Sequence, residues 1–245
     1  MNRIYLIIAL SWFSSSVSAD LLRVAVSGNL AGAIKEINQR FELASGHKAS
    51  TSIGSTSQLA TQLLHGAPFD VLLAANEREP LRVMRERGLA LSHYAVYAQG
   101  RLVLYTRHTE DRDIWSQFQK SSSRFVMANP KLAPYGLAAQ QVLQHHDLFE
   151  QVSPRLIKAE NIAQAFQYVI SGQTEFGFVG LSQAVLMSGD AFDYYILPDH
   201  WYQPILQGML RLNAKPVSVS YMNFILSSEI QRLLQNKYGY GAVKE

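Results

Sequence analysis

The chain has 245 residues, a formal net charge of +3, 48% hydrophobic residues and no cysteine. Its lysines and arginines are scattered rather than clustered, which argues against a nucleic-acid-binding surface. The absence of cysteine excludes a disulfide framework and a lipid anchor attached to that residue. A chain of this length can bury enough apolar surface to fold as one large or two small domains.

Residues 1–19 have the organisation of a secretory signal peptide. Arg3 gives the segment a positively charged N-terminal region, and an apolar region follows over residues 4–13. A region of small residues then ends at Val17-Ser18-Ala19, which fits a cleavage site. The apolar run is shorter than the roughly 20 residues that a membrane-spanning helix needs. We therefore expect this segment to be removed and the mature protein to be a soluble exported protein that begins near Asp20.

Strand and helix patterns alternate along the first part of the chain. A strand is predicted over residues 21–26, a helix from Leu30 to Gly46 and a second strand over residues 49–53. A helix beginning near Ser57, an apolar strand over 69–75 and a polar helix over 79–87 follow. Three successive strand and helix units predict a parallel-rich sheet with helices on both faces.

The pattern begins again after Gly100. Strands are predicted over 101–106, 124–128, 175–179, 194–197 and 205–212, and helices over 137–146, 161–170, 181–187 and 216–238, the last interrupted at 227–229. The final helices follow a late strand, so we expect the chain to return to its first lobe. We assign residues 20–101 and 206–245 to lobe I and residues 102–205 to lobe II, with a ligand cleft between them.

Four turns follow predicted strands and open predicted helices, where backbone N–H groups are free to bind an anion. Gly28 permits close backbone approach, and the Asn29 amide can donate two hydrogen bonds. Thr56 lies within three consecutive hydroxyl residues, Tyr135 offers a phenol, and the step into Ile162 offers backbone N–H groups. The alternative for Asn29 and Thr56 is helix capping, and for Tyr135 it is packing.

Motifs of known catalytic machinery are missing. The chain has no G-x-S-x-G elbow, no H-E-x-x-H, no P-loop and no G-x-G-x-x-G. His145 and His146 are adjacent on a predicted helix, so they face different sides and do not chelate one ion; we expect both to be exposed. We therefore predict no catalytic residue, no protein-ligated metal ion and no cofactor.

Five pieces of sequence, taken in order, carry a resemblance to a known family. They are residues 24–30, 54–60, 66–71, 134–138 and 177–182. No single piece is specific, but the ordered set resembles the periplasmic molybdate-binding proteins of ABC importers. The resemblance implies an α/β, two-lobed periplasmic-binding-protein fold of type II. It also implies a monomer that holds molybdate or tungstate as an intact oxyanion and delivers it to a membrane ABC permease.

The resemblance also implies a set of site residues. Asn29 matches the first contact position, with Gly28 beside it, and Thr56 matches the central hydroxyl of the family's Gly-Ser-Ser motif. Tyr135 matches a tyrosine of the third turn, and Ile162 matches the backbone donor of the fourth. Gly180 stands where other members carry a tyrosine, so we expect Tyr135 to supply the phenol.

Two other functions remain open from the sequence, and a third does not. One is a binding protein for another small oxyanion, such as sulfate or phosphate. These anions differ from molybdate by a small difference in radius, which no sequence pattern distinguishes. Another is a sensor module that presents its liganded form to a receptor. A secreted hydrolase or transferase would need a nucleophile paired with a base, and the sequence offers no such pair.

Overall fold

The computed structural model describes residues 21–107, 113–187, 189 and 191–243. The predicted signal peptide, residues 1–19, lies outside the described residues. Within the described ranges, none of the helices is both long and apolar enough to cross a bilayer.

Lobe I is built on a five-stranded sheet of order β2-β1-β3-β10-β4. The strands are β1 (Leu21–Ser27), β2 (Lys48–Gly54), β3 (Val71–Leu73), β4 (Tyr94–Gly100) and β10 (Ile205–Arg211). β1 is parallel to β2 and β3, whereas β10 is antiparallel to both β3 and β4. The late strand β10 therefore brings the chain back to the sheet with which it began.

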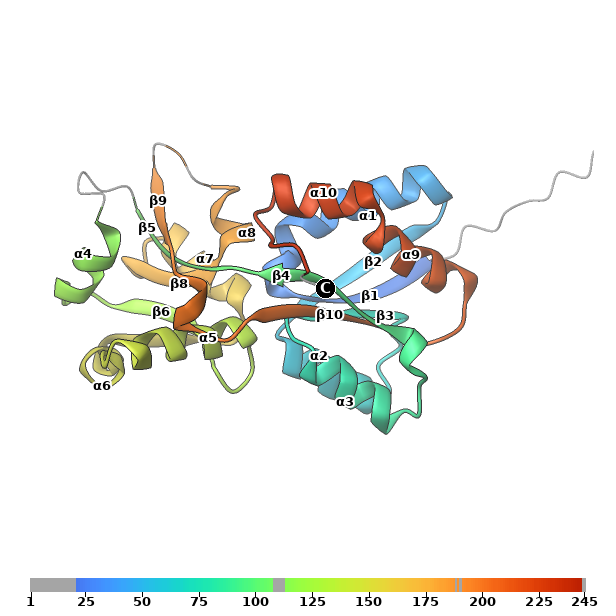
Figure 1. Ribbon diagram of the computed structural model, residues 1–245, viewed down its shortest axis with the longest axis horizontal. Helices are drawn as coiled ribbons and strands as arrows, with labels where there is room; N and C mark the ends of the chain where they lie inside the picture. Colours follow the sequence, from blue (N-terminus) through green and yellow to red (C-terminus); the bar gives the residue numbers. More distant parts are fainter. Residues whose placement is uncertain (1–20, 108–112, 188, 190, 244–245) are drawn as a thin grey trace, which may run out of the picture.

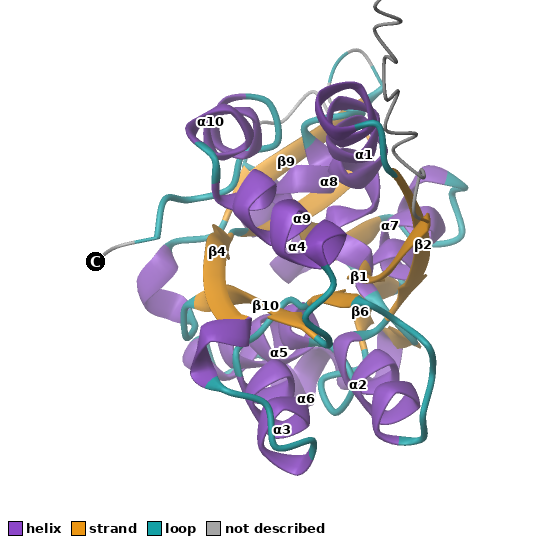
Figure 2. Cartoon of the chain, turned by 90° about the vertical axis from the view of Figure 1, so that its right-hand side faces the viewer, coloured by secondary structure: helices purple, strands orange, loops and turns teal. Residues whose placement is uncertain are grey.

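Helices cover both faces of this sheet (Figure 2), which gives lobe I two hydrophobic cores. The helices are α1 (Ala31–Ser45), α2 (Thr56–Leu64), α3 (Arg78–Glu86), α9 (Pro216–Leu226) and α10 (Ser228–Asn236). The β1 side chains alternate between the two cores: Val24 and Val26 pack with α1 and α9, and Ala25 packs with α2. This two-sided burial explains the near-continuous apolar run in the strand sequence.

Lobe II has a second five-stranded sheet, of order β7-β6-β8-β5-β9. Its strands are β5 (Leu102–Arg107), β6 (Phe125–Ala128), β7 (Leu156–Ala159), β8 (Phe176–Gly180) and β9 (Phe192–Ile196). Its helices are α4 (Ile114–Lys120), α5 (Pro134–His145), α6 (Phe149–Val152), α7 (Ile162–Ile170) and α8 (Leu181–Ala184). Short 3-10 helices occur in both lobes. They are η1 (Gly28–Leu30), η2 (Leu91–His93), η3 (Ser153–Arg155) and η4 (Asp199–Trp201).

Two crossover strands join the lobes (Figure 1), and the C-terminal segment lies beside them. β4 ends at Gly100 and β5 begins at Leu102, so Arg101 alone separates strands of the two sheets. On the return, Ile205 of β10 pairs with Gly100. Gly241 of the C-terminal segment exchanges backbone hydrogen bonds of 3.0 and 2.8 Å with Gln99. Three chain segments thus meet at the crossover.

The predicted two-lobed α/β fold, with sheets flanked by helices, is confirmed, but each sheet is mixed, with two parallel and two antiparallel pairings, instead of parallel-rich. The sequence prediction missed α4, α6, β7 and the beginning of β4, and it began α5 three residues late. Pro134 begins that helix because its ring fixes a helical φ and the missing N–H has no intrahelical partner there. His145 is exposed as predicted, but His146 is half-buried, with its ring centroid 4.2 Å from that of Trp201.

Candidate functional site

The first turn of the site follows β1. Gly28 and Asn29 form η1 and are buried. A Cβ on Gly28 would lie 3.1 Å from both the Cβ and the backbone nitrogen of Ala163, in the first turn of α7. Glycine here lets the lobe I backbone reach the beginning of a lobe II helix.

The second turn opens α2, and its three hydroxyls have different partners. Ser55 is the N-cap residue and completes a capping box with Gln58, so the helix is capped without Thr56. The fully buried Thr56 hydroxyl accepts a 3.2 Å hydrogen bond from Ala75 N–H and donates a 3.1 Å bond to the Ser27 hydroxyl. Thr56 therefore lies beside the end of β1, adjacent to Gly28, and capping does not explain its hydroxyl.

The third turn opens α5, and it brings Tyr135 to the crossover. The Tyr135 hydroxyl lies 3.4 Å from Asn29 Nδ2 and against the backbone of Gly100. Burial raises the pKa of Tyr135 well above its ordinary value, so the phenol remains protonated. A Cβ on Gly180 would lie 3.3 Å from the Tyr135 ring. Gly180, which stands where other family members carry a tyrosine, is therefore directly beside Tyr135.

The fourth turn opens α7. Asn161 caps this helix by accepting a 3.0 Å hydrogen bond from Gln164 N–H. Ile162 and Ala163 occupy the first two helical positions, whose N–H groups have no acceptor within the helix. Because a Cβ on Gly28 would lie 3.1 Å from the Ala163 nitrogen, this helix start adjoins the end of β1.

The structure thus brings the five predicted residues Gly28, Asn29, Thr56, Tyr135 and Ile162 together where the two lobes meet. Direct hydrogen bonds across the interface accompany this arrangement. Ser57 N–H donates to Leu132 O at 3.3 Å, and the Ser182 hydroxyl donates to Asn29 O at 2.8 Å. The lobes are therefore closed on each other around the site.

The Asn29 side chain has partners that sequence reasoning missed. Its Nδ2 donates to Gln207 Oε1 and to the Tyr240 hydroxyl, both at 2.8 Å, while no partner for Oδ1 is found among the described residues. The two amide hydrogens predicted to be available for a ligand are thus directed at protein acceptors. Gln207 lies on β10 and Tyr240 in the C-terminal segment, far from Asn29 in sequence, so no local pattern could have paired them.

Ser27 and Ser182 are further buried hydroxyls at the site that the sequence analysis did not single out. Ser182 follows β8 at the start of a helix, so the rule used for the four other turns would have found it. The side chains that hydrogen-bond Asn29 and Thr56 are neutral. Neutral hydroxyls and helix N-termini can hold a compact anion without a buried counter-charge. Within the described ranges, no cluster of His, Asp and Glu could hold a metal ion.

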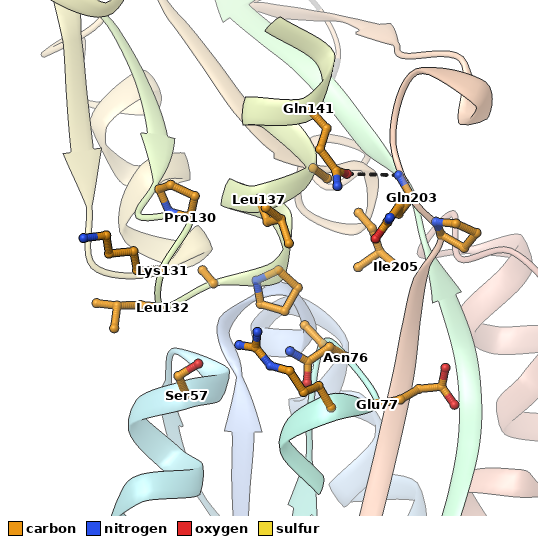
Figure 3. Close-up of a pocket in the computed structure, with 16 residues that line it drawn as sticks. Ser57, Asn76, Glu77, Pro130, Lys131, Leu132, Leu137, Gln141, Gln203 and Ile205 are labelled. Atoms are coloured by element: carbon orange, nitrogen blue, oxygen red, sulfur yellow. Dashed lines mark hydrogen bonds between the residues drawn. The ribbon is translucent and has the colours of Figure 1, made fainter. Parts of the chain in front are cut away.

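A cavity of about 320 Å³ lies between the lobes next to these turns (Figure 3). It is lined by Ser57, Asn76 and Glu77 from lobe I and by Lys131 and Gln141 from lobe II, among others. None of the five predicted residues, all of which the structure describes, lines this cavity. Ser57 and Pro134, which immediately follow Thr56 and precede Tyr135, do line it. The cavity therefore adjoins the second and third turns.

Comparison with known proteins places the chain in a family. The bacterial extracellular solute-binding protein family matches residues 22–241. The molybdate-binding protein ModA of Azotobacter vinelandii is 32% identical over 98% of both chains. ModA of Rhodobacter capsulatus is 31% identical over 88% of this chain and 86% of its own.

Solved structures agree with this family. The periplasmic molybdate-binding protein of Azotobacter vinelandii has a TM-score of 0.82 at 26% identity, covering 91% of this chain and 100% of its own. The sulfate-binding protein SubI from Mycobacterium tuberculosis has a TM-score of 0.71 at 12% identity, covering 90% of this chain and 86% of its own. The second likeness shows the fold alone.

Proposed function

We propose a function from one premise: this chain belongs to the bacterial extracellular solute-binding protein family. It is a binding protein and not an enzyme. We propose that it captures molybdate outside the cytoplasm and delivers it to a membrane ABC permease. The observation that carries this proposal is the meeting of four helix-opening turns at one buried point between two closed lobes. Relatives aligned over nearly the whole chain are named for molybdate, which supports that anion.

Within this function we assign the ligand site to Gly28, Asn29, Thr56, Tyr135 and Ile162. Tyr135 contributes its hydroxyl, and Thr56 contributes a hydroxyl whose hydrogen turns from Ser27 to the anion. Asn29 and Ile162 contribute backbone N–H groups at helix starts. A charge-assisted hydrogen bond is worth roughly 1.5–3 kcal/mol. About six of them would hold a dianion tightly even after the cost of ordering the lobes.

The remaining assignments follow from the same proposal. Tungstate has the same tetrahedral shape and charge as molybdate, and we propose that it binds equally. The ligand is held as an intact oxyanion, with no cofactor and no protein-ligated cation. We propose that the protein acts as a monomer in the periplasm after residues 1–19 are removed. Residues 20–101 with 206–245 form one moving body, and residues 102–205 form the other.

Binding proceeds by closure of the lobes. In the open form, the dianion is held by the turns of one lobe, such as those at Asn29 and Thr56. Rotation at the crossover then brings the N–H groups of Ile162 and Ala163 against it. Contacts that exist only in the closed form shift the population toward that form.

The direct test is isothermal titration of the mature protein with molybdate, tungstate, sulfate and phosphate at one pH and ionic strength. We expect saturable one-to-one binding of molybdate and tungstate and much weaker binding of sulfate and phosphate. Tight sulfate or phosphate binding without molybdate binding would change the proposed ligand but leave the proposed oxyanion site standing. The absence of binding by all four anions would overturn the oxyanion function.

A further inference from the structure

The C-terminal segment contributes a side chain that touches the proposed site. Tyr240 is 4% exposed and follows α10. Its hydroxyl accepts a 2.8 Å hydrogen bond from Asn29 Nδ2 and donates a 3.1 Å hydrogen bond to Asn29 O. One phenol therefore fixes both the side chain and the peptide plane of the same residue.

Gln207 determines which way the Asn29 amide points. Gln207 is fully buried, and its Nε2 donates a 2.9 Å hydrogen bond to Ile205 O. Its Oε1 must therefore face Asn29, and it accepts the hydrogen bond from Asn29 Nδ2 at 2.8 Å. An Asn29 amide turned by 180° would place two acceptors against each other, which a buried site does not tolerate.

The Asn29 amide is saturated by these contacts. It has two hydrogens, and Gln207 and Tyr240 take both at 2.8 Å, while the Tyr135 hydroxyl lies at 3.4 Å. Burial raises the pKa of Tyr240 above its ordinary value, so its hydroxyl stays protonated and can both accept and donate. The Asn29 side chain is thus held in place, and since Asn29 O already accepts hydrogen bonds from Ser182 and Tyr240, the backbone N–H is the donor that remains for an anion.

We propose that Tyr240, together with Gln207, is a positioning residue for Asn29, so that this one tyrosine of the C-terminal segment acts in ligand binding. This inference rests on the proposed function. Gly241, the next residue, pairs with Gln99 on the crossover strand β4. The same segment therefore connects Asn29 to the strand at which the lobes rotate.

The chain offers a matched control. Tyr238 lies two residues earlier in the same segment, and its hydroxyl donates a 2.7 Å hydrogen bond to Glu36 Oε2 in lobe I. Tyr238→Phe and Tyr240→Phe each remove one phenol hydroxyl from the C-terminal segment, but only Tyr240→Phe releases Asn29. A purely structural role of the segment would make the two variants alike.

The first experiment is titration of wild type and both variants with molybdate. We expect Tyr240→Phe to bind about tenfold more weakly, the equivalent of about one net hydrogen bond, and Tyr238→Phe to stay within about twofold of wild type. Wild-type affinity in Tyr240→Phe, or equal weakening in both variants, would overturn the inference.

A second experiment needs no ligand. Hydrogen exchange of the Asn29 side-chain amide, followed by NMR in the free protein, should be slow in wild type and Tyr238→Phe and about tenfold faster in Tyr240→Phe. Equal rates in the three proteins would overturn the inference. If wild type bound no oxyanion, the proposed function would fail, and the exchange rates would still decide whether Tyr240 positions Asn29.

Discussion

The Ser182 hydroxyl, on α8 of lobe II, donates a 2.8 Å hydrogen bond to the backbone carbonyl of Asn29 in lobe I. Both residues are buried, with 4% and 1% of their surfaces exposed. Because this hydrogen bond joins the two lobes, we expect its energy to contribute to closure and not to the folding of either lobe.

Replacement of Ser182 by alanine should therefore weaken anion binding. We expect a loss of about 1 kcal/mol, because Asn29 O keeps Tyr240 as a partner. Ser153→Ala, which removes an exposed hydrogen bond elsewhere in lobe II, is the control. Titration with molybdate measures both variants, and equal affinities would contradict the role of Ser182 in closure.

Thr56→Ala should cost roughly 1–3 kcal/mol of molybdate binding, because it removes a site hydroxyl and leaves Ala75 N–H without its acceptor. Thr56→Ser keeps the hydroxyl and should retain most of the affinity. Ser57→Ala removes the neighbouring hydroxyl, which faces Glu79, and serves as the control in the same titration. Loss of affinity in Ser57→Ala but not in Thr56→Ala would assign the ligand contact to Ser57 instead of Thr56.

Gly28→Ala should impair closure more than folding. The added Cβ would meet Ala163 of the other lobe at 3.1 Å, and relief of such overpacking costs roughly 1–3 kcal/mol. The control is Gly54→Ala, whose Cβ would meet Leu59 within lobe I at 3.3 Å. Small-angle X-ray scattering should show less compaction of Gly28→Ala on addition of molybdate. Full compaction with wild-type affinity would refute the proposed approach of Gly28 to α7.

We expect the contacts of Glu36 with the C-terminal segment to weaken at acidic pH. Hydrogen bonds from Lys237, Tyr238 and Arg40 lower its pKa from 4.5 to about 2. Because the folded-state pKa is depressed, the resulting stability is complete above pH 4.5 and is lost as the pH falls toward 2.

Thermal melts between pH 6 and pH 2.5 test this expectation. Glu36→Gln should be less stable than wild type at pH 6, and the difference should shrink as the pH falls. Glu42→Gln, which removes a carboxylate 3.7 Å from the exposed Lys48, provides the control. A constant difference between wild type and Glu36→Gln across this range would contradict the assignment.

Local sequence patterns were sufficient to predict the strands and helices where an apolar strand, a turn and an apolar helix follow one another. Thr56 and Ile162 could be placed at helix starts because the preceding strand and the following apolar spacing are both visible in the sequence. The strand β7 was missed because it has only the four residues Leu156–Ala159 and lies at the edge of its sheet. Its alternation is too short to distinguish from a loop.

The polar partners of Asn29 could not be predicted for a different reason. Tyr240 is 211 residues away in sequence, and Gln207 is 178 residues away. Glutamine in a strand and tyrosine near a chain end have no local signature, because their roles come from packing at the crossover. The prediction that the Asn29 amide was free followed from considering only its neighbours in sequence.

The crossover also determines how lobe II is connected to the rest of the chain. The chain leaves lobe I at Gly100 and re-enters it at Ile205, and these two residues are paired partners on adjacent antiparallel strands. Such partners have Cα atoms only about 4.5–5.5 Å apart. Lobe II is thus an insertion whose two ends nearly touch, a geometry in which a whole module can be exchanged. Transplanting residues 102–205 between relatives would therefore assign ligand preference to one lobe or the other, which single substitutions cannot do.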